Sequence, residues 1–416
     1  MKGTPNDSTF LNQRRYEEHE EVGYRKRDAF QRDRDRIMHS RAFRRMMHKT
    51  QIFNANMGDH YRNRLTHTLE VCQIARSIGK ALDLNDELIE AIALGHDLGH
   101  TPFGHIGERT LHEILMNGSI SKETKICQGF KHNFQSLRVV DELECRCSDY
   151  PGLNLTLAVR EGMLKHTQMQ MNKAPVVFPE GNFEYMDLDA PAFTFEGQVV
   201  ALADEIAQCT HDLEDGVRSG IISFNAVCDD PLVQKVMEES KIRINKHTRT
   251  PAYDTRALVI KTMVGYFIKD ACIESSQRID EYINNYSPNY TDKSNCIKEK
   301  CIMLSPSVES ARKKLYKDMI INRVICSEQI SISDSKSEYL IRQLFKAFYT
   351  HPKQLPDYVL EKYCERCGVE FNRASLDIEA FQLDHRFIRT ICDHIAGMTD
   401  QFAAREYNRL YVPEYQ

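Results

Sequence analysis

Hydrophobic positions recur every three to four residues through most of the chain, which is the spacing of helices that bury one face. In residues 60–82 this spacing produces an apolar stripe made of Leu65, Leu69, Cys72, Ile74, Ala75 and Ile78. Residues 86–100 repeat the pattern, and Asn85 and Asp86 are suited to cap the start of that segment. Pro102 is expected to end it, because proline has no amide donor and disfavours helix in the residue before it. The pattern therefore predicts two consecutive helices joined by a short turn.

Helical spacing continues beyond this pair, in segments that differ in length. It predicts one long helix over 194–219, further helices over 103–116, 131–147, 307–328 and 336–350, and one or two closing helices over 376–411. Two stretches break the pattern. Residues 284–299 are rich in Asn and Ser and predict a long exposed loop. Residues 168–191 contain three prolines and predict a loop with room for a short hairpin.

Arginines and apolar residues are interleaved at helical spacing in residues 32–48. Ile37, Phe43 and Met47 are predicted to face the core, while the arginines face outward as a solvated surface or as contacts to phosphate. A subunit contact is the other use considered for the arginines of this part of the chain and for Arg218.

The composition supports a helical fold. The 416 residues include only 19 glycines and 13 prolines, below the usual ~7% and ~5%, and an all-β chain would need more turn residues. We therefore predict an all-α bundle with a helical C-terminal extension. The length suggests about three domains. The expected boundaries are an N-terminal helical segment with the Arg-rich and KTQIF motifs (1–59), a metal-binding catalytic core (60–220) and a helical C-terminal region (221–416).

The charge and the cysteine content indicate which partners and which cellular compartment to expect. Lys and Arg total 55 against 60 Asp and Glu, so the net charge is -5 and a nucleic-acid coat is not favoured, single-stranded DNA included. No apolar stretch of about 18 residues and no leader-like segment is found, which predicts a cytoplasmic protein with no membrane contact. The 13 cysteines form no framework and are interpreted as reduced thiols. This includes the CxxC at Cys364 and Cys367, which lies too far from Cys145 and Cys147 for a zinc knuckle.

The residues with the strongest chemical potential are His67, the adjacent pair His96 and Asp97, and Asp204. Each lies on a predicted helix, so three helices of a bundle can direct two imidazoles and two carboxylates to one point. This mixture of nitrogen and oxygen ligands suits Mn, Fe, Co, Ni or Zn better than calcium.

A second group of titratable residues follows in the segment GHDLGHTPFGHIGER, residues 95–109. His96 and His100 are four residues apart, and His105 and Glu108 are three apart, so each pair shares a helix face. A carboxylate beside an imidazole fixes its tautomer and raises its basicity, which suits a general acid or base. A polar helix end is the alternative, but so many titratable groups are costly to bury without a function.

These residues resemble the H…HD…D signature of HD-domain proteins, which carry a metal on that pattern. More narrowly, the chain is similar to the dGTPase-like deoxynucleoside triphosphate triphosphohydrolases. The similarity rests on six stretches in the family's order and is weakest over 221–380. These stretches are RDRDRIMHSRAFRRMMHKTQIF (32–53), RNRLTHTLEV (62–71), EAIALGHDLGHTPFGHIGE (90–108), GFKHNFQSLRVV (129–140), GQVVALADEIAQCTHDLEDGVRSG (197–220) and IAGMTDQFA (395–403).

The resemblance implies an HD-domain bundle that hydrolyses a dNTP, dGTP or another, at the α-phosphorus to deoxynucleoside and intact triphosphate. The implied metal ligands are His67, His96, Asp97 and Asp204. The implied catalytic pair is His105 held by Glu108, and the implied phosphate-side histidines are His100 and His132. The implied substrate contacts are Arg64 for the α-phosphate and Gln51 and Asp212 for the sugar 3′-hydroxyl. Mg is expected to accompany the triphosphate.

The resemblance also implies a homo-oligomer, for which a hexamer is one arrangement, and a dNTP effector at a second site. Two positions depart from the family pattern. Gln208 replaces a frequent Tyr four residues after Asp204, and His394 follows Asp393 where Tyr is frequent. His166 is open between a place beside the metal and an ordinary helix-end role, while structural or surface roles are expected for His39, His48, His112 and His211.

Two other functions remain open at this stage. One is an HD phosphohydrolase that acts on another phosphoester, such as a nucleoside monophosphate or a cyclic dinucleotide. The long similarity over 32–53 and 197–220 argues against it. The other is a nucleotide- or DNA-sensing module with little turnover, against which the complete ligand set and the pair His105 and Glu108 argue.

Overall fold

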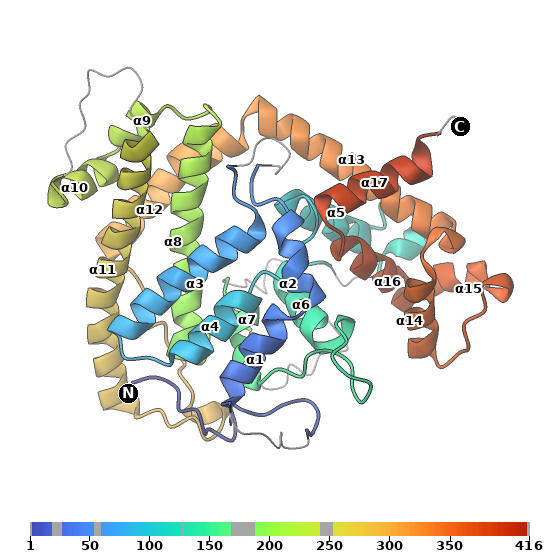
Figure 1. Ribbon diagram of the computed structural model, residues 1–416, viewed down its shortest axis with the longest axis horizontal. Helices are drawn as coiled ribbons and strands as arrows, with labels where there is room; N and C mark the ends of the chain where they lie inside the picture. The colour runs from blue at the N-terminus through green and yellow to red at the C-terminus, as the bar shows by residue number, and fades with distance from the viewer. Residues whose placement is uncertain are drawn as a thin grey trace.

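The computed structural model describes residues 2–18, 27–53, 60–126, 129–167, 188–241 and 253–413, and the regular secondary structure of these residues is helical (Figure 1). Within those ranges the chain forms 17 α-helices and no strand, so the all-α prediction is confirmed. The predicted loop over 168–191 lies mostly outside the described residues. No helix in the described ranges is long and apolar enough to cross a membrane.

The helices divide into two hydrophobic clusters. The first is formed mainly by α1 (Ala29–Met38), α2 (Arg41–Arg45), α3 (Arg64–Ala81), α4 (Asp86–Gly95), α6 (His132–Arg138), α7 (Leu157–Leu164), α8 (Phe195–Arg218), α9 (Phe224–Cys228), α10 (Pro231–Glu239), α11 (Tyr253–Tyr286) and α12 (Pro306–Leu315). The second is formed mainly by α5 (Gly104–Asn117), α13 (Glu328–Thr350), α14 (Asp357–Cys367), α15 (Ile378–Leu383), α16 (His385–Ala396) and α17 (Asp400–Tyr411). α5 packs on α13, and the two groups lie side by side in Figure 1.

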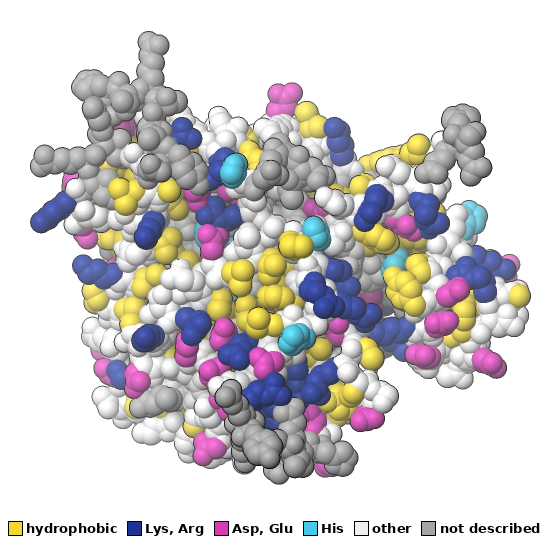
Figure 2. Space-filling model, in the orientation of Figure 1, with side chains coloured by type: hydrophobic (Ala, Val, Ile, Leu, Met, Phe, Trp, Pro, Cys, Tyr) yellow, Lys and Arg dark blue, Asp and Glu magenta, His cyan; other side chains and the backbone are white. Residues whose placement is uncertain are grey.

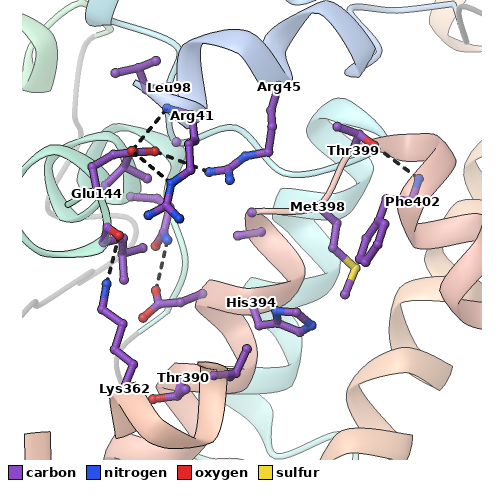
Figure 3. A pocket seen from close by; sticks show the side chains of 18 of the residues that line it. Arg41, Arg45, Leu98, Glu144, Lys362, Thr390, His394, Met398, Thr399 and Phe402 are labelled. Atoms are coloured by element: carbon purple, nitrogen blue, oxygen red, sulfur yellow. Dashed lines mark hydrogen bonds and ion pairs between the residues drawn. The ribbon is translucent and has the colours of Figure 1, made fainter. Parts of the chain in front are cut away.

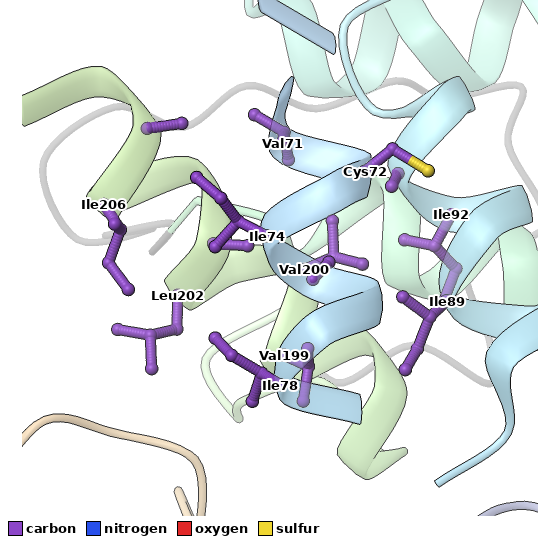
Figure 4. Packing of buried hydrophobic residues seen from close by; sticks show 14 of the residues in the cluster. Val71, Cys72, Ile74, Ile78, Ile89, Ile92, Val199, Val200, Leu202 and Ile206 are labelled. Atoms are coloured by element: carbon purple, nitrogen blue, oxygen red, sulfur yellow. The ribbon is translucent and has the colours of Figure 1, made fainter. Parts of the chain in front are cut away.

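The centre of the first cluster is the packing of α3 against α4 and α8. Ile74 and Ile78 of α3 lie on the side of α8, with Val199, and Ile89 of α4 lies on the opposite side of α3 (Figure 4). These side chains are fully buried or nearly so. Burying each such side chain stabilises the fold by about 1.5–3 kcal/mol. This rigid packing fixes the relative position of the three segments that carry the predicted metal ligands.

Both α3 and α4 begin after an asparagine whose side chain caps the helix. Asn63 caps α3 with a reciprocal bond to Thr66, and the side chain of Asn85 accepts a hydrogen bond from the amide of Leu88 at the start of α4. α4 ends at Gly95, earlier than Pro102, because the chain turns sharply over residues 96–99. The expectation that Pro102 ends the helix is therefore wrong.

Several predicted core positions also differ. Ile37 and Phe43 are buried as predicted, but Met47 is exposed and Met46 is buried in its place. The cause is a 3₁₀ turn over Met46–His48, which changes the helical register after α2. Leu69 is exposed because it lies at the outer edge of the stripe on α3.

Arg36 contradicts the outward-facing role expected for the arginines of 32–48. It is buried and donates to the carbonyl oxygens of Leu153 and Asn154 and to the carboxylate of Glu18. The buried carbonyl oxygens of Leu153 and Asn154 require hydrogen-bond donors, and the guanidinium group of Arg36 supplies them.

Two C-terminal predictions are corrected as well. The stretch 284–299 is not exposed throughout, because α11 extends to Tyr286 and the loop anchors itself by burying Tyr290, Cys296 and Ile297. The closing region holds three helices, because Asp384 caps α16 directly after α15 and Thr399 caps α17. The domain boundaries at 59 and 220 stay predictions.

Candidate active site

Four predicted ligands converge between α3, α8 and the turn that follows α4. His67 lies in the first turn of α3, and its Nε2 is 3.0 Å from Oδ1 of Asp204 on α8. His96 Nε2 is 3.5 Å from Oδ1 of Asp97 and 3.9 Å from Oδ1 of Asp204. Side chains from three elements therefore direct two nitrogen and two oxygen ligand atoms to one region.

The state of His96 tests whether this group fits a metal. Its Nδ1 lies 2.7 Å from the carbonyl oxygen of Ala93 and donates to it, so the lone pair of the neutral ring is on Nε2. That Nε2 is completely buried and has no hydrogen-bond partner. A buried imidazole nitrogen facing two carboxylates is the environment of a metal ligand, and this donor set suits a divalent ion.

A second histidine lies behind His67. His67 Nδ1 is 3.2 Å from Nδ1 of His211, and His211 Nε2 is 3.2 Å from Oε2 of Glu70. The chain of contacts holds the ring of His67 so that Nε2 faces Asp204. From the sequence, His211 is expected to be only a structural or surface group. Its spacing of seven residues from Asp204 on one helix is the signal that could have placed it here.

Asp97 is the most connected carboxylate of the site. Its Oδ1 is 3.1 Å from His100 Nε2, and its Oδ2 accepts from Arg64 Nη1 at 2.7 Å. Burial raises the pKa of Asp97, but His100, His96 and Arg64 outweigh it and hold the pKa well below its usual range. Asp97 is therefore an anion at neutral pH, ready to neutralise a bound cation.

Arg64 also carries two guanidinium nitrogens that do not bind Asp97. It is almost fully buried, and its Nε and Nη2 have no hydrogen-bond partner. Unsatisfied guanidinium nitrogens are costly to bury. They are also the donors that recognise phosphate oxygens, so the site is suited to an anionic ligand beside the four ligand residues.

The expected pairing of His105 with Glu108 differs from the structure. Glu108 Oε2 accepts from His132 Nδ1 at 2.5 Å, and Oε1 accepts from Lys131 at 2.8 Å. His132 lies at the N-terminus of α6, and the sequence spacing could not show that this end faces α5. His105 is exposed, and its ring centroid is 5.7 Å from that of His100.

The rings of His100, His132 and His166 contact one another next to Asp97 and Glu108. His132 stacks on His100 with ring centroids 3.9 Å apart, and its Nε2 is 3.2 Å from Nε2 of His166. His166 is buried and lies 4.0 Å from Oδ1 of Asp97. His166 also has a helix-end contact, because its Nδ1 is 2.7 Å from the carbonyl oxygen of Met163 in α7, so both roles left open for it stay predictions.

The residues expected to read the sugar lie on two sides of the site. The carbonyl oxygen of Gln51 approaches Gly104 at the start of α5, and the Oε1 of Gln51 is buried without a partner. Asp212 is eight residues after Asp204 on α8 and accepts from the hydroxyl of Tyr316 at 3.2 Å. Burial, with Asp215 nearby, raises the pKa of Asp212 well above its ordinary value. Tyr316 was missed because no motif marks its region.

The turn that carries His96 and Asp97 depends on Gly99. The amide of Gly99 donates to the hydroxyl of Ser136 at 2.9 Å, and that hydroxyl donates to the carbonyl oxygen of His96. A Cβ at Gly99 would stand 2.1 Å from the backbone nitrogen of Ser136 and 2.4 Å from the carbonyl oxygen of His132. Only glycine allows the turn to approach α6 this closely.

Gly99→Ala is therefore expected to destabilise the fold by at least about 1–3 kcal/mol, the scale of overpacking, and to weaken metal binding by displacing the turn. Urea unfolding of the metal-free protein and a metal titration measure the two effects. Gly265→Ala, on α11 with open space around its Cβ, is the matched control and should be neutral or stabilising. An unchanged unfolding midpoint for Gly99→Ala would contradict this interpretation of the turn.

The chain is similar in sequence to known protein families and to proteins of other organisms. The sequence matches the HD domain over residues 64–208 and the phosphohydrolase-associated domain over 302–409. It is 36% identical over 397 residues to a deoxyguanosinetriphosphate triphosphohydrolase-like protein of Brucella canis, covering 92% of this chain and 90% of that one. A protein of the same description from Geobacter metallireducens is 37% identical over 390 residues, covering 93% and 89%. The chain belongs to the HD-domain deoxyguanosinetriphosphate triphosphohydrolase-like family.

As an HD-domain phosphohydrolase, the chain is a metal-dependent enzyme of the nucleotide triphosphohydrolase type. His67, His96, Asp97 and Asp204 all lie within the residues that match the HD domain. The phosphohydrolase-associated domain extends from the region of α12 to α17.

This phosphohydrolase also has a cavity of about 420 Å³ where the associated domain meets α2 and the turn after α4 (Figure 3). Arg41 and Arg45 enter it from α2, Lys362 and Arg366 from α14, and Leu98 forms part of the wall toward the HD ligands. Figure 2 shows Lys and Arg gathered in a band over α1 and α2 that extends toward α14. Glu144 pairs with Arg41 and Arg45. The cavity is nevertheless cationic overall, because Arg405 also lines it and Asp393 is the only other carboxylate among the described lining residues.

Proposed function

We propose that the protein hydrolyses deoxynucleoside triphosphates to deoxynucleoside and inorganic triphosphate, with dGTP or other dNTPs as substrates. The observation that carries the proposal is the convergence of His67, His96, Asp97 and Asp204 on one region. The unpartnered Nε2 of His96 lies there, and Arg64 presents unpartnered guanidinium nitrogens nearby. A metal position beside free phosphate donors suits attack on a phosphorus atom.

The metal site would be formed by His67, His96, Asp97 and Asp204. A divalent transition metal there, of the group Mn, Fe, Co, Ni and Zn, supplies polarisation of the α-phosphate and a lowered pKa of bound water. Mg would accompany the triphosphate, as hard cations bind phosphate oxygens.

The other side chains of the site would bind the phosphate and the sugar and transfer a proton. The free Nε and Nη2 of Arg64 would bind an α-phosphate oxygen and balance the charge that develops on it. His105, exposed at the edge of the site, would act in proton transfer, either by activating the attacking water or by shuttling a proton to the departing 5′-oxygen. Gln51 and Asp212 would hold the 3′-hydroxyl.

Glu108 would act through a different histidine from the one expected. Because Glu108 accepts from Nδ1 of His132, it would hold that imidazole against the stacked ring of His100, with Nε2 at His166. His100, His132, His105 and Glu108 would then form one catalytic group in which the carboxylate orients His132 directly.

We further propose a dNTP effector in the cavity of Figure 3, since its cationic side chains from α2 and α14 suit a polyphosphate. A homo-oligomer, with a hexamer as one arrangement, stays a prediction that light scattering with and without nucleotide tests. Single-stranded DNA stays the less favoured ligand because of the net charge of -5.

The test of the proposed function is incubation of metal-replete protein with each of the four dNTPs, singly and mixed, followed by anion-exchange separation. We expect deoxynucleoside and triphosphate in equal amounts, and the rates rank the bases. Turnover only in the mixture would indicate the effector. Thermal stabilisation by dNTPs without any product would favour a sensing module instead.

A further inference from the structure

Asp400, the first residue of α17, belongs to the stretch IAGMTDQFA (395–403), and its side chain is buried at the junction of the two hydrophobic clusters. Its Oδ1 accepts from the amide of Phe103 at 2.9 Å. Its Oδ2 accepts from the amide of Thr50 at 2.9 Å and also from the Thr50 hydroxyl. One carboxylate therefore binds two loops that are separated by about 50 residues.

Both loops lead directly into the site. Phe103 precedes Gly104, and both have positive φ, 61° and 60°, so the chain bends sharply before α5 begins. An aromatic residue rarely adopts this conformation unless its surroundings enforce it. The bend sets the direction of α5, which carries His105 in its first turn and Glu108 in its second.

The second loop carries the residue expected to hold the sugar. Thr50 is followed by Gln51, whose carbonyl oxygen approaches Gly104 on the other loop. Lys49, one residue earlier, donates from Nζ to the carbonyl oxygens of His100 and of Ala396 at the end of α16. Adjacent residues of one segment thus contact the C-terminal domain and the loop between Asp97 and α5.

We propose that Asp400 is a positioning residue for the active site: it holds the Gln51 segment and the start of α5 in the relative position that turnover requires. A carboxylate can do this because it offers two acceptor atoms and can receive all three donors at once. An amide in its place offers one acceptor oxygen and turns a donor toward the loop amides. The effect on turnover rests on the proposed function, whereas the anchoring of the loops does not.

The test compares Asp400→Asn with wild type and with Asp377→Ala. Asp377 caps α15, a helix of the same hydrophobic cluster, by accepting from the amide of Ala380, so its loss weakens that cluster without changing Asp400. Hydrogen exchange of peptides covering 49–53 and 100–106 reports the anchor, and kcat, KM and metal content report the site. Thermal unfolding checks that all three proteins are folded at the assay temperature.

We expect Asp400→Asn to exchange at least tenfold faster over 100–106 and to lose about tenfold to a hundredfold in kcat, with metal content unchanged. Asp377→Ala should unfold at lower temperature yet keep wild-type exchange over 100–106 and wild-type kcat. Unchanged exchange in Asp400→Asn would overturn the proposal, and so would faster exchange with unchanged kcat. An equal loss of kcat in Asp377→Ala would also overturn it, because the effect would then be general destabilisation. A wild-type protein that releases no triphosphate contradicts the proposed function, and the exchange comparison alone then decides the anchor.

Discussion

Asp97→Ala is expected to lose bound metal and turnover together, with kcat/KM reduced about a thousandfold or more. The carboxylate faces His96 Nε2 and is the partner of Arg64 Nη1. Its removal takes away an oxygen ligand and leaves a buried guanidinium without its counterion. Losing metal polarisation of the reacting phosphate costs several kcal/mol of transition-state stabilisation, which corresponds to this factor.

Metal analysis of the purified variant, with activity measured in parallel, checks this prediction. Asp141→Asn is a suitable control, because Asp141 is also a buried carboxylate paired with an arginine, Arg160, but contacts none of the four proposed ligands. It should lose stability and keep its metal. A full metal content in Asp97→Ala would remove Asp97 from the proposed ligand set.

His105→Ala is expected to keep the metal and lose about 10²–10⁴-fold in kcat, the usual contribution of a general acid or base. His105 is exposed on α5, and its ring lies beside His100 rather than among the four proposed ligands. Its loss should therefore leave the metal environment unchanged while removing a proton-transfer group from the edge of the site.

The matched control for this variant lies on the same helix. His112 contacts the backbone of Phe130 through Nδ1, so His112→Ala should affect packing and leave kcat close to that of wild type. Single-turnover kinetics separate the chemical step from product release. Normal single-turnover rates for His105→Ala would exclude it from the mechanism.

The long helices were predictable because their stability comes from one continuous apolar face. The segments 60–82 and 194–219 correspond closely to α3 and α8, where burial repeats with the helical period. Prediction failed where the period changes within a few residues. The 3₁₀ turn after α2 exchanged the roles of Met46 and Met47, and the sharp turn after Gly95 ended α4 before Pro102.

In the candidate site, too, some residues could be predicted from the sequence and some contacts could not. The likeness of the ligand pattern to a known family indicated His67, His96, Asp97 and Asp204, and the structure brings these side chains together, although their role stays a proposal. Partners set by tertiary packing were beyond the sequence. Neither the pairing of Glu108 with His132 nor the contact of Asp400 with Phe103 follows from any spacing, since it depends on how α5 meets α6 and α17.

The most direct test of the account is hydrolysis of dGTP in water enriched in ¹⁸O, with mass spectrometry of both products. Attack at the α-phosphorus breaks its bond to the 5′-oxygen and forms a new bond to the oxygen of water. We therefore expect one ¹⁸O atom in the released triphosphate and none in the deoxyguanosine. Label in the deoxyguanosine, or phosphate or pyrophosphate in place of triphosphate, would contradict it.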